Sequence, residues 1–433
     1  MFLRLRWLIV ACVFLTALFQ PARWLFSSFG HRQGQTGYDS YSIEFLRPDL
    51  RLRSVCETPE RISALLTYAN DSYASDQVLI GTASTGRVYG YDPEFPELLM
   101  LFAAGLGDEA ESGTCEVSSL MIGDFHGDGQ KDLLAATSQV SPRGRPRIYA
   151  WSLSDQTIRR PILIGMARPE IESSWGHGLA LLKRPQSGEP SLFSTFCGHG
   201  EVLEFQGRHD STASGFKTQG LSWRQVNMLP ASGEQAVAAD ADNDGQPDLC
   251  LATGFSRGNA AVLIYRFGEN GVDSKPRHRI DERGRFGNVR FLVGDARGDG
   301  QQDLIAWWCT DLSNGQCTMI RYRFDPRGQR QRTQITWGQA EALWPLEGQM
   351  SLTDFDQDGH PEVWFATSSG YLWCYDPSKR PALSLVGQFH GKFGPIAAAR
   401  IGLDRHPCLF IGCDRQLLCL ERSNQTTVAA ISK

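Results

Sequence analysis

The 433-residue sequence predicts an all-β fold: a single seven-bladed β-propeller with calcium loops, after an N-terminal hydrophobic export segment. Three observations support this prediction. An acidic loop recurs at blade-length intervals, a strand–turn–strand pattern occurs seven times, and no long helical pattern lies between the copies. We expect residues 1–35 to be a signal peptide or signal-anchor with a linker, residues 36–59 a lead-in segment, and residues 60–433 the propeller.

The acidic loop is clearest in VAADADNDGQPDLCLAT, residues 237–253. Its carboxylates repel one another unless a cation lies among them, and Gly245 permits the sharp bend of a short loop around an ion. Oxygen ligands at alternating positions are what calcium binds. An EF-hand is excluded because its twelfth position is Leu251 instead of Glu, and a β-type run follows. The predicted Ca²⁺ ligands of this loop are Asp240, Asp242, Asp244 and Asp248.

The same loop occurs three more times. TDFDQDGHPEVWFAT (353–367) is a second complete copy, whereas GDFHGDGQKDLLAAT (123–137) and GDARGDGQQDLIAWW (294–308) lack the middle acid. The first aspartates stand at positions 124, 240, 295 and 354, so the intervals are 116, 55 and 59, and one copy between 124 and 240 has lost its acids. The further predicted ligands are Asp354, Asp356, Asp358 and Glu362, then Asp124, Asp128 and Asp132, then Asp295, Asp299 and Asp303.

Each loop has an alternative interpretation as an acidic turn held by backbone hydrogen bonds, without an ion. This alternative has more support for the loop at Asp124 than for the two complete loops, because His126 is a poor calcium ligand. In the loop at Asp295, the guanidinium of Arg297 can reach the neighbouring carboxylates and replace the ion by a salt bridge. The same stretch contains the tripeptide at 297–299, Arg-Gly-Asp, which integrins bind; we interpret it as a by-product of the repeat.

A strand, a glycine-bearing turn and a second strand follow each loop. The pattern is clear in QVLIGTASTGRVYGYDP (77–93), SLFSTFCGHGEVLEF (191–205), EVWFATSSGYLWCYDP (362–377) and CLFIGCDRQLLCLER (408–422). Related hairpins begin near Leu133, Leu249 and Leu304. Seven units of four short strands predict a seven-bladed propeller, with degenerate acidic loops near residues 71, 183 and 404.

One unit, FGNVRFLVGDARGDGQQDLIAWW (286–308), resembles an FG-GAP or VCBS repeat: Phe-Gly, a short strand, Gly-Asp, a calcium loop and an apolar strand. Such repeats build the propeller of integrin α subunits and of many exported bacterial proteins. By repeat count the resemblance extends over about residues 60–430, although four units carry the loop clearly. It implies the fold and bound calcium, but not one biological role, because this architecture serves adhesion, carbohydrate binding and a few enzymes.

The N-terminus indicates export. Arg4 and Arg6 precede WLIVACVFLTALF (7–19), and Pro21 ends this apolar run, which has the length of a signal peptide and is short for a membrane span. No clean cleavage site follows, so attachment to the membrane through an uncleaved signal-anchor is the alternative. In both cases the propeller is expected in the periplasm or outside the cell, where millimolar calcium fills weak sites.

Ten cysteines follow the apolar segment, an even number that is compatible with disulfides in an oxidising compartment. The candidate pairs are Cys309 with Cys317 and Cys413 with Cys419, each spanning one predicted hairpin. The alternative, small buried thiols within strands, is favoured for Cys250 and Cys374.

Charge and motifs limit the possible functions. The net charge of −5 argues against a nucleic-acid partner. No nucleophile elbow, zinc-protease motif or phosphate loop occurs, so we predict no catalytic residue and no cofactor besides Ca²⁺, and we favour a protein without enzymatic activity. The alternative is a lyase or hydrolase acting on polysaccharide, with His177 or His199 near the channel.

Tryptophans suggest where a ligand binds. Trp175, Trp337 and Trp344 stand next to Gly or Pro in predicted connections and are expected at the surface, whereas Trp307, Trp364 and Trp373 are expected in the core. We therefore predict a calcium-stabilised module that binds a protein or carbohydrate ligand on one propeller face. A third hypothesis, a scaffold subunit of an envelope complex, predicts a large apolar patch on the outer blades.

Overall fold

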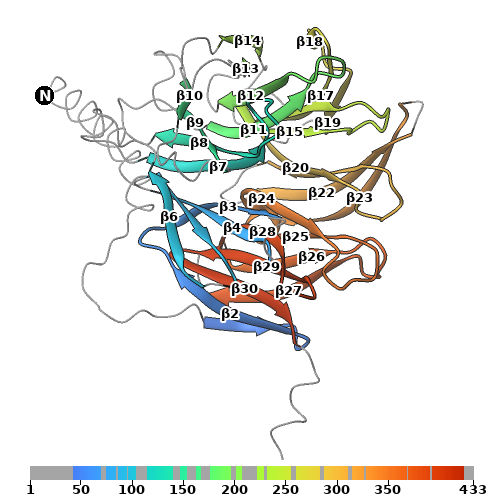
Figure 1. Cartoon of the computed structure of the whole chain (residues 1–433). Coiled ribbons are helices and arrows are strands. Elements are labelled where there is room, and N and C mark those ends of the chain that lie inside the picture. The colour runs from blue at the N-terminus through green and yellow to red at the C-terminus, as the bar shows by residue number, and fades with distance from the viewer. Residues whose placement is uncertain are drawn as a thin grey trace, which may run out of the picture. The chain divides into compact units, whose positions relative to one another are not determined.

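The computed structural model describes residues 42–69, 75–83, 86–94, 96–103, 115–139, 147–153, 162–166, 176–196, 201–206, 222–228, 232–254, 260–282, 287–310, 315–325, 328–367, 369–390 and 393–423. Their strands form seven antiparallel sheets in a ring (Figure 1), which confirms the predicted seven-bladed β-propeller. The first strand of each sheet contacts the first strand of the next sheet, and β28 of the last sheet contacts β3 of the first, so the ring is closed.

The sheets are numbered here as blades in chain order. Blade 1 consists of β3 (Ile62–Tyr68), β4 (Gln77–Thr82), β5 (Arg87–Tyr91) and β6 (Leu98–Ala103). Blade 2 consists of β7 (Cys115–Gly123), β8 (Asp132–Gln139), β9 (Arg147–Ser152) and β10 (Ile162–Met166). Blade 3 consists of β11 (Gly176–Lys183), β12 (Pro190–Phe196), β13 (Glu201–Gln206) and β14 (Ser222–Met228).

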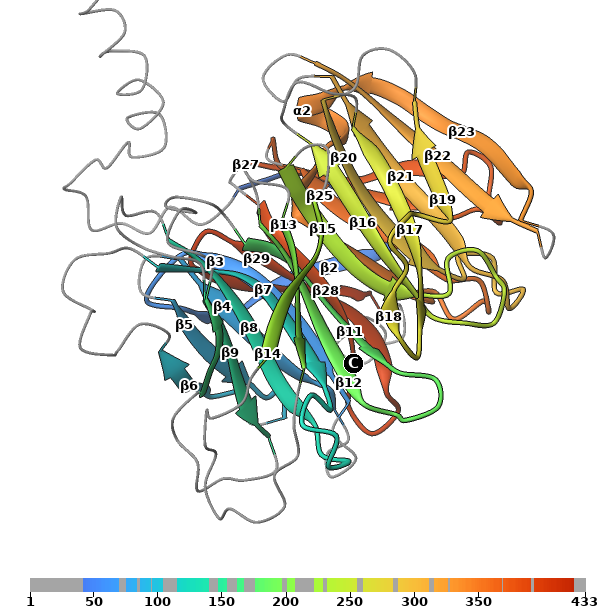
Figure 2. The same cartoon turned by 90° about the horizontal axis from the view of Figure 1, so that it is seen from above.

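Blade 4 consists of β15 (Ser232–Ala239), β16 (Asp248–Gly254), β17 (Ala261–Gly268), β18 (Gly271–Val272) and β19 (His278–Asp281). Blade 5 consists of β20 (Asn288–Gly294), β21 (Asp303–Cys309), β22 (Gln316–Phe324) and β23 (Arg330–Gln339). Blade 6 consists of β24 (Pro345–Thr353), β25 (Glu362–Thr367), β26 (Tyr371–Tyr375), β27 (Leu383–His390) and β1 (Ser42–Leu46). Blade 7 consists of β28 (Phe393–Ile401), β29 (His406–Cys413), β30 (Gln416–Arg422) and β2 (Leu50–Glu57). The short helix α2 (Ala340–Leu343) lies beside β23, before β24 (Figure 2).

The core lies between neighbouring blades, and the second strand of a blade contributes to it on both faces. In β21 every residue is buried. Because successive side chains of a strand point to opposite faces, Trp308 packs with residues of blade 4 such as Ile264, whereas Trp307 packs against Phe365 of blade 6, with ring centroids 5.1 Å apart. This double burial explains why the strand after each acidic loop is a continuous apolar run.

The ring is closed by pairing the two ends of the described chain. Strand β2 pairs with β30 and completes blade 7 (Figure 1). Strand β1 pairs with β27 as a fifth strand of blade 6. The backbone N–H of Ile62 also donates to the carbonyl of Asp414 at 2.7 Å. Part of the expected lead-in segment, residues 36–59, thus belongs to the propeller, because the described strands begin at Ser42 and not near residue 60.

No helix among the described residues has both the length and the apolar character needed to cross a membrane. The expected signal peptide or signal-anchor lies outside the described residues.

None of the described cysteines forms a disulfide, so the two expected disulfides are not formed. Cys309 and Cys317 lie opposite each other in β21 and β22, but they remain thiols. Cys419 lies opposite Phe410 in the strand register, which separates it from its expected partner Cys413. Burial raises the pKa of the Cys413 thiol to about 11, and all except one of the described thiols are buried, as the alternative interpretation predicts.

We expect ring closure by β2 to stabilise the whole propeller. A chain that begins at residue 59 lacks β1 and β2 and exposes the edges of β27 and β30, so it should unfold at lower urea concentration and associate through these edges. The measurement is urea unfolding combined with sedimentation velocity. A chain that ends at Ser423 retains every described strand and is the control; equal unfolding midpoints and a monomeric state for both truncations would contradict the prediction.

Candidate metal centres in the acidic loops

The four acidic loops occupy the same position in their blades. Each connects the first strand to the second, in blades 2, 4, 5 and 6. In blades 3 and 7 the equivalent connections are residues 184–189 and 402–405, where degenerate loops were predicted near residues 183 and 404. Because all first strands lie side by side around the ring, these connections share one face of the propeller.

The two complete loops gather their carboxylates. In blade 6 the four predicted ligands bring one oxygen each to within 4.8 Å of one another, and in blade 4 three of the four predicted ligands do the same. These groups are Asp354, Asp356, Asp358 and Glu362, called the blade 6 cluster below, and Asp240, Asp242 and Asp248, called the blade 4 cluster. The fourth acid of blade 4, Asp244, lies outside its cluster and instead contacts the guanidinium of Arg277.

Backbone hydrogen bonds curl each loop around its first aspartate. The carboxylate of Asp240 accepts the N–H groups of Asp244 at 3.0 Å and of Gly245 at 2.9 Å. In blade 6, Asp354 accepts the N–H groups of the equivalent residues, at 3.0 and 3.1 Å. Gly245 adopts φ +84°, a left-handed conformation that glycine tolerates without strain. The bend therefore directs the loop's carboxylates toward one point.

The last acid of each complete loop is buried at the start of the second strand. Asp248 is 0% exposed and Glu362 is 2% exposed. One oxygen of Asp248 accepts the N–H of Ala241 at 3.1 Å, while its other oxygen, Oδ1, is buried without a hydrogen-bond partner. A buried carboxylate that lacks compensation is unfavourable unless it binds a proton or a cation.

Burial also changes the pKa of both buried acids. Burial, with the nearby charge of Asp242, raises the pKa of Asp248 to about 7. Burial, with the nearby charge of Asp356, raises the pKa of Glu362 to about 7. Both clusters offer only oxygen atoms as ligands, and in the blade 4 cluster the buried Oδ1 of Asp248 has no hydrogen-bond partner. Such sites fit a hard divalent cation.

Basic side chains also contact both clusters. They lie outside the acidic-loop motif, so the motif did not predict them. In blade 4, Arg277 Nη1 lies 3.0 Å and His278 Nε2 3.1 Å from Oδ2 of Asp242. In blade 6, Lys379 contacts Asp356. Arg277 and Lys379 stand in connections to the outer strands of their blades. Alternating strand directions place the connection after the third strand on the same face as the acidic loop, and this is the signal that could have identified them.

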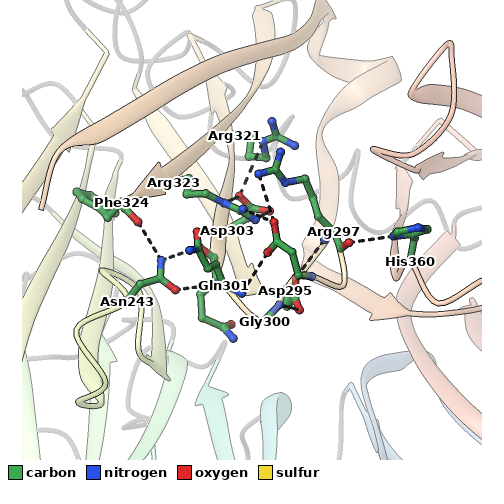
Figure 3. A network of polar contacts seen from close by, with 12 residues as sticks. Asn243, Asp295, Arg297, Gly300, Gln301, Asp303, Arg321, Arg323, Phe324 and His360 are labelled. Atoms are coloured by element: carbon green, nitrogen blue, oxygen red, sulfur yellow. Dashed lines mark hydrogen bonds and ion pairs between the residues drawn. The ribbon is translucent and has the colours of Figure 1, made fainter. Parts of the chain in front are cut away.

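In blade 5 an arginine pairs with the carboxylates of the acidic loop (Figure 3), and it is not the expected one. Arg323 donates from Nε and Nη2 to both oxygens of Asp303, each at 2.7 Å, and from Nη1 to Asp299 at 2.6 Å. The expected residue, Arg297, lies 3.4 Å from Asp299 at the surface. The strand register explains this role of Arg323. Tyr322 in β22 pairs with Leu304 in β21, so the next residue, Arg323, lies opposite Asp303 and directs its side chain inward.

In blade 2 the predicted ligands Asp124, Asp128 and Asp132 do not form one of the clusters found among the described residues. Lys183 Nζ lies 2.7 Å from Asp124, and Nδ1 of His126 lies 2.9 Å from Oδ2 of Asp132. The acidic turn without an ion, the alternative interpretation for this loop, agrees with these contacts.

Contacts between loops join blades 4, 5 and 6 (Figure 3). The side chain of Asn243 in blade 4 accepts the N–H of Gln302 in blade 5 at 2.7 Å and donates to the carbonyl of Phe324 at 3.2 Å. Nδ1 of His360 in blade 6 lies 2.9 Å from the carbonyl oxygen of Arg297. The backbone of the Arg-Gly-Asp tripeptide thus contacts blade 6, while its Arg297 and Asp299 side chains are exposed, and its interpretation as a by-product of the repeat stays a prediction.

The tryptophan predictions have mixed outcomes. Trp307 and Trp364 are buried and Trp337 is 66% exposed, as expected. Trp344 and Trp373 are half-buried. Trp175, the side chain of His177 and all of His199 lie outside the described residues.

A cavity of about 440 Å³ lies between blades 5 and 6, beside Trp337. Its other lining residues include Leu343, Trp373, Pro381 and Leu383. The indole N–H of Trp373 donates to the carbonyl of Ala342 at 2.7 Å, which fixes that ring in the wall of the cavity.

Comparisons with models of known protein families and with curated proteins gave no match.

We predict that Arg323→Met destabilises the protein by about 3 kcal/mol, because it leaves Asp303 buried without its partner. Urea unfolding measures the loss. Arg332→Met, which removes an arginine paired with Glu282 near the surface, is the matched control and should change stability by less than about 1 kcal/mol. Equal losses for the two variants would contradict the role of Arg323.

We also predict an unusual pH dependence in metal-free buffer. The folded-state pKa of about 7 for Asp248 and Glu362 lies above their ordinary values of 3.8 and 4.5. The folded protein therefore holds protons that the unfolded chain has lost, so these groups make the free energy of unfolding fall as the pH rises from about 4 through 7. Asp248→Asn with Glu362→Gln should remove this contribution. Urea unfolding at pH 5, 6, 7 and 8 tests it; identical slopes for variant and wild type would refute it.

Proposed function

We propose that the protein is an exported, calcium-stabilised β-propeller of the FG-GAP/VCBS type that acts as a binding module for a protein or carbohydrate of the cell envelope. The repeat motif and the apolar N-terminal segment support the repeat type and export. The seven-bladed ring supports a binding role, because propellers present loops on two open faces around a rigid frame.

The observation that carries the calcium proposal is the geometry of the blade 4 cluster. Three carboxylates converge there, and one oxygen of the buried Asp248 has no hydrogen-bond partner. The clusters offer only carboxylate oxygens, which suit calcium and not a metal that prefers sulfur or imidazole. A bound ion would neutralise the converging charges and fix the connection between the first two strands.

Two separate features on opposite faces of the propeller support the binding role: Trp337, near the end of β23, and the linked acidic loops. An exposed indole beside a cavity can stack on a sugar ring or anchor a protein side chain. The hydrogen bonds of Asn243 and His360 hold the acidic loops of three blades together, so the loop face is ordered before a ligand arrives.

Calcium should raise the stability of the protein. At a free concentration one hundred times the dissociation constant, each occupied site contributes about 2.7 kcal/mol. Asp242→Asn and Glu362→Gln should each reduce the gain, because each removes one anionic ligand, whereas Asp128→Asn in blade 2 should leave it unchanged. Thermal unfolding in calcium and in EDTA measures these effects. An equal melting temperature in the two buffers for the wild type would contradict calcium stabilisation.

Ligand binding is tested by capture from envelope proteins and polysaccharides, in calcium and in EDTA. We expect one component to be retained in calcium and lost in EDTA, and its retention to fall at least about tenfold with Trp337→Ala, as at binding hot spots. Leu99→Ala, which alters an equally exposed side chain on the outer strand β6 of blade 1, is the control. Shortening of a polysaccharide during incubation, without retention of any component, would instead indicate catalysis.

A further inference from the structure

Lys379 lies at the blade 6 cluster, in the connection between β26 and β27. Its ammonium contacts Asp356 and lies 3.8 Å from Oδ2 of Asp358, and both aspartates belong to the cluster. It also lies 2.6 Å from Oδ2 of Asp376, which precedes it in the same connection. The ammonium therefore occupies space beside the oxygens that a metal ion would bind.

The connection holds Lys379 in this position. Asp376 is buried, and its carboxylate accepts the N–H of Ser378 at 2.8 Å and its hydroxyl at 2.6 Å. The backbone N–H of Lys379 donates to the carbonyl of Asp376 at 3.3 Å. This turn directs the lysine side chain toward the acidic loop.

Lys379 differs from Arg323 in how easily its side chain can leave. The side chain of Lys379 is 53% exposed, so it can turn into solvent without disturbing the core. The side chain of Arg323 is 8% exposed and donates hydrogen bonds to both oxygens of Asp303, so it cannot turn into solvent without disturbing the core. The side chain of Arg277 in blade 4 is 38% exposed, so it resembles that of Lys379 in its access to solvent.

We propose that Lys379 is a tethered competitor that lowers the calcium affinity of the blade 6 cluster. This inference rests on the calcium binding proposed above. An ammonium and a divalent ion repel each other at a separation of a few ångströms, so they cannot both contact Asp356 and Asp358. Metal binding expels the lysine side chain, and the lysine returns when the ion leaves. The acidic loop is thus partly neutralised at low calcium, and the site fills only at higher calcium concentration.

The direct test compares Lys379→Met with wild type by calorimetric titration of the full chain with CaCl₂. Both proteins carry Asp242→Asn, which impairs the blade 4 cluster and leaves blade 6 as the principal site. Lys379→Met should bind calcium about tenfold more tightly, because the ion no longer has to break the partly exposed ion pairs of the lysine. Lys379→Arg keeps the charge and should bind like wild type. Lys131→Met, beside the blade 2 loop, is the control and should also bind like wild type.

A second measurement separates competition from a structural role. In EDTA, Lys379→Met should melt below wild type, because the carboxylates lose their partner. In saturating calcium it should melt at or above wild type. A lysine that only stabilises the fold would lower the melting temperature in both buffers.

Two results would overturn the competitor role while leaving the proposed function intact: calcium affinities within twofold of each other, or a lower melting temperature of Lys379→Met in both buffers. Failure of every protein to bind calcium, including the chain without Asp242→Asn, would overturn the proposed calcium function and this inference with it.

Discussion

The structure depends on one constraint: each acidic loop ends in a carboxylate that is buried at the start of an apolar strand. Asp132, Asp248, Asp303 and Glu362 are each exposed by 2% or less. A buried anion without compensation opposes folding, so every blade that keeps this acid also needs a positive or hydrogen-bonding partner for it. Blade 5 supplies Arg323, and blade 2 supplies His126 with backbone N–H groups. In blades 4 and 6 the converging carboxylates suit a divalent cation.

The same constraint extends to a blade whose loop has lost its motif. Asp76 directly precedes β4 of blade 1 and is 9% exposed. It accepts the backbone N–H of Arg400 and the guanidinium of Arg405, both from blade 7. The acid is therefore retained and joins the first blade to the last, next to the ring closure made by β2 and β30.

The sequence was sufficient to predict the elements that depend on local spacing. The acidic loops, the hairpins after them and the seven blades follow from residues close together in the chain, because glycine bends and strand alternation act over a few positions. The partners of the buried acids could not be found in this way. Arg323 stands 20 residues after Asp303 and Lys379 stands 23 residues after Asp356, so only the pairing of distant strands and their connections decides which basic residues reach the acids. Ring closure was missed because Leu50–Glu57 pairs with a strand that lies more than 350 residues later.

The most direct test of this account is a crystal structure of the propeller grown with calcium and analysed by anomalous scattering. The account predicts one calcium peak at the blade 4 cluster and one at the blade 6 cluster, with none beside Asp303, where Arg323 lies. Density at Asp303, or none at the blade 4 and blade 6 clusters, would contradict the claim that each buried carboxylate is compensated either by a metal ion or by a side chain.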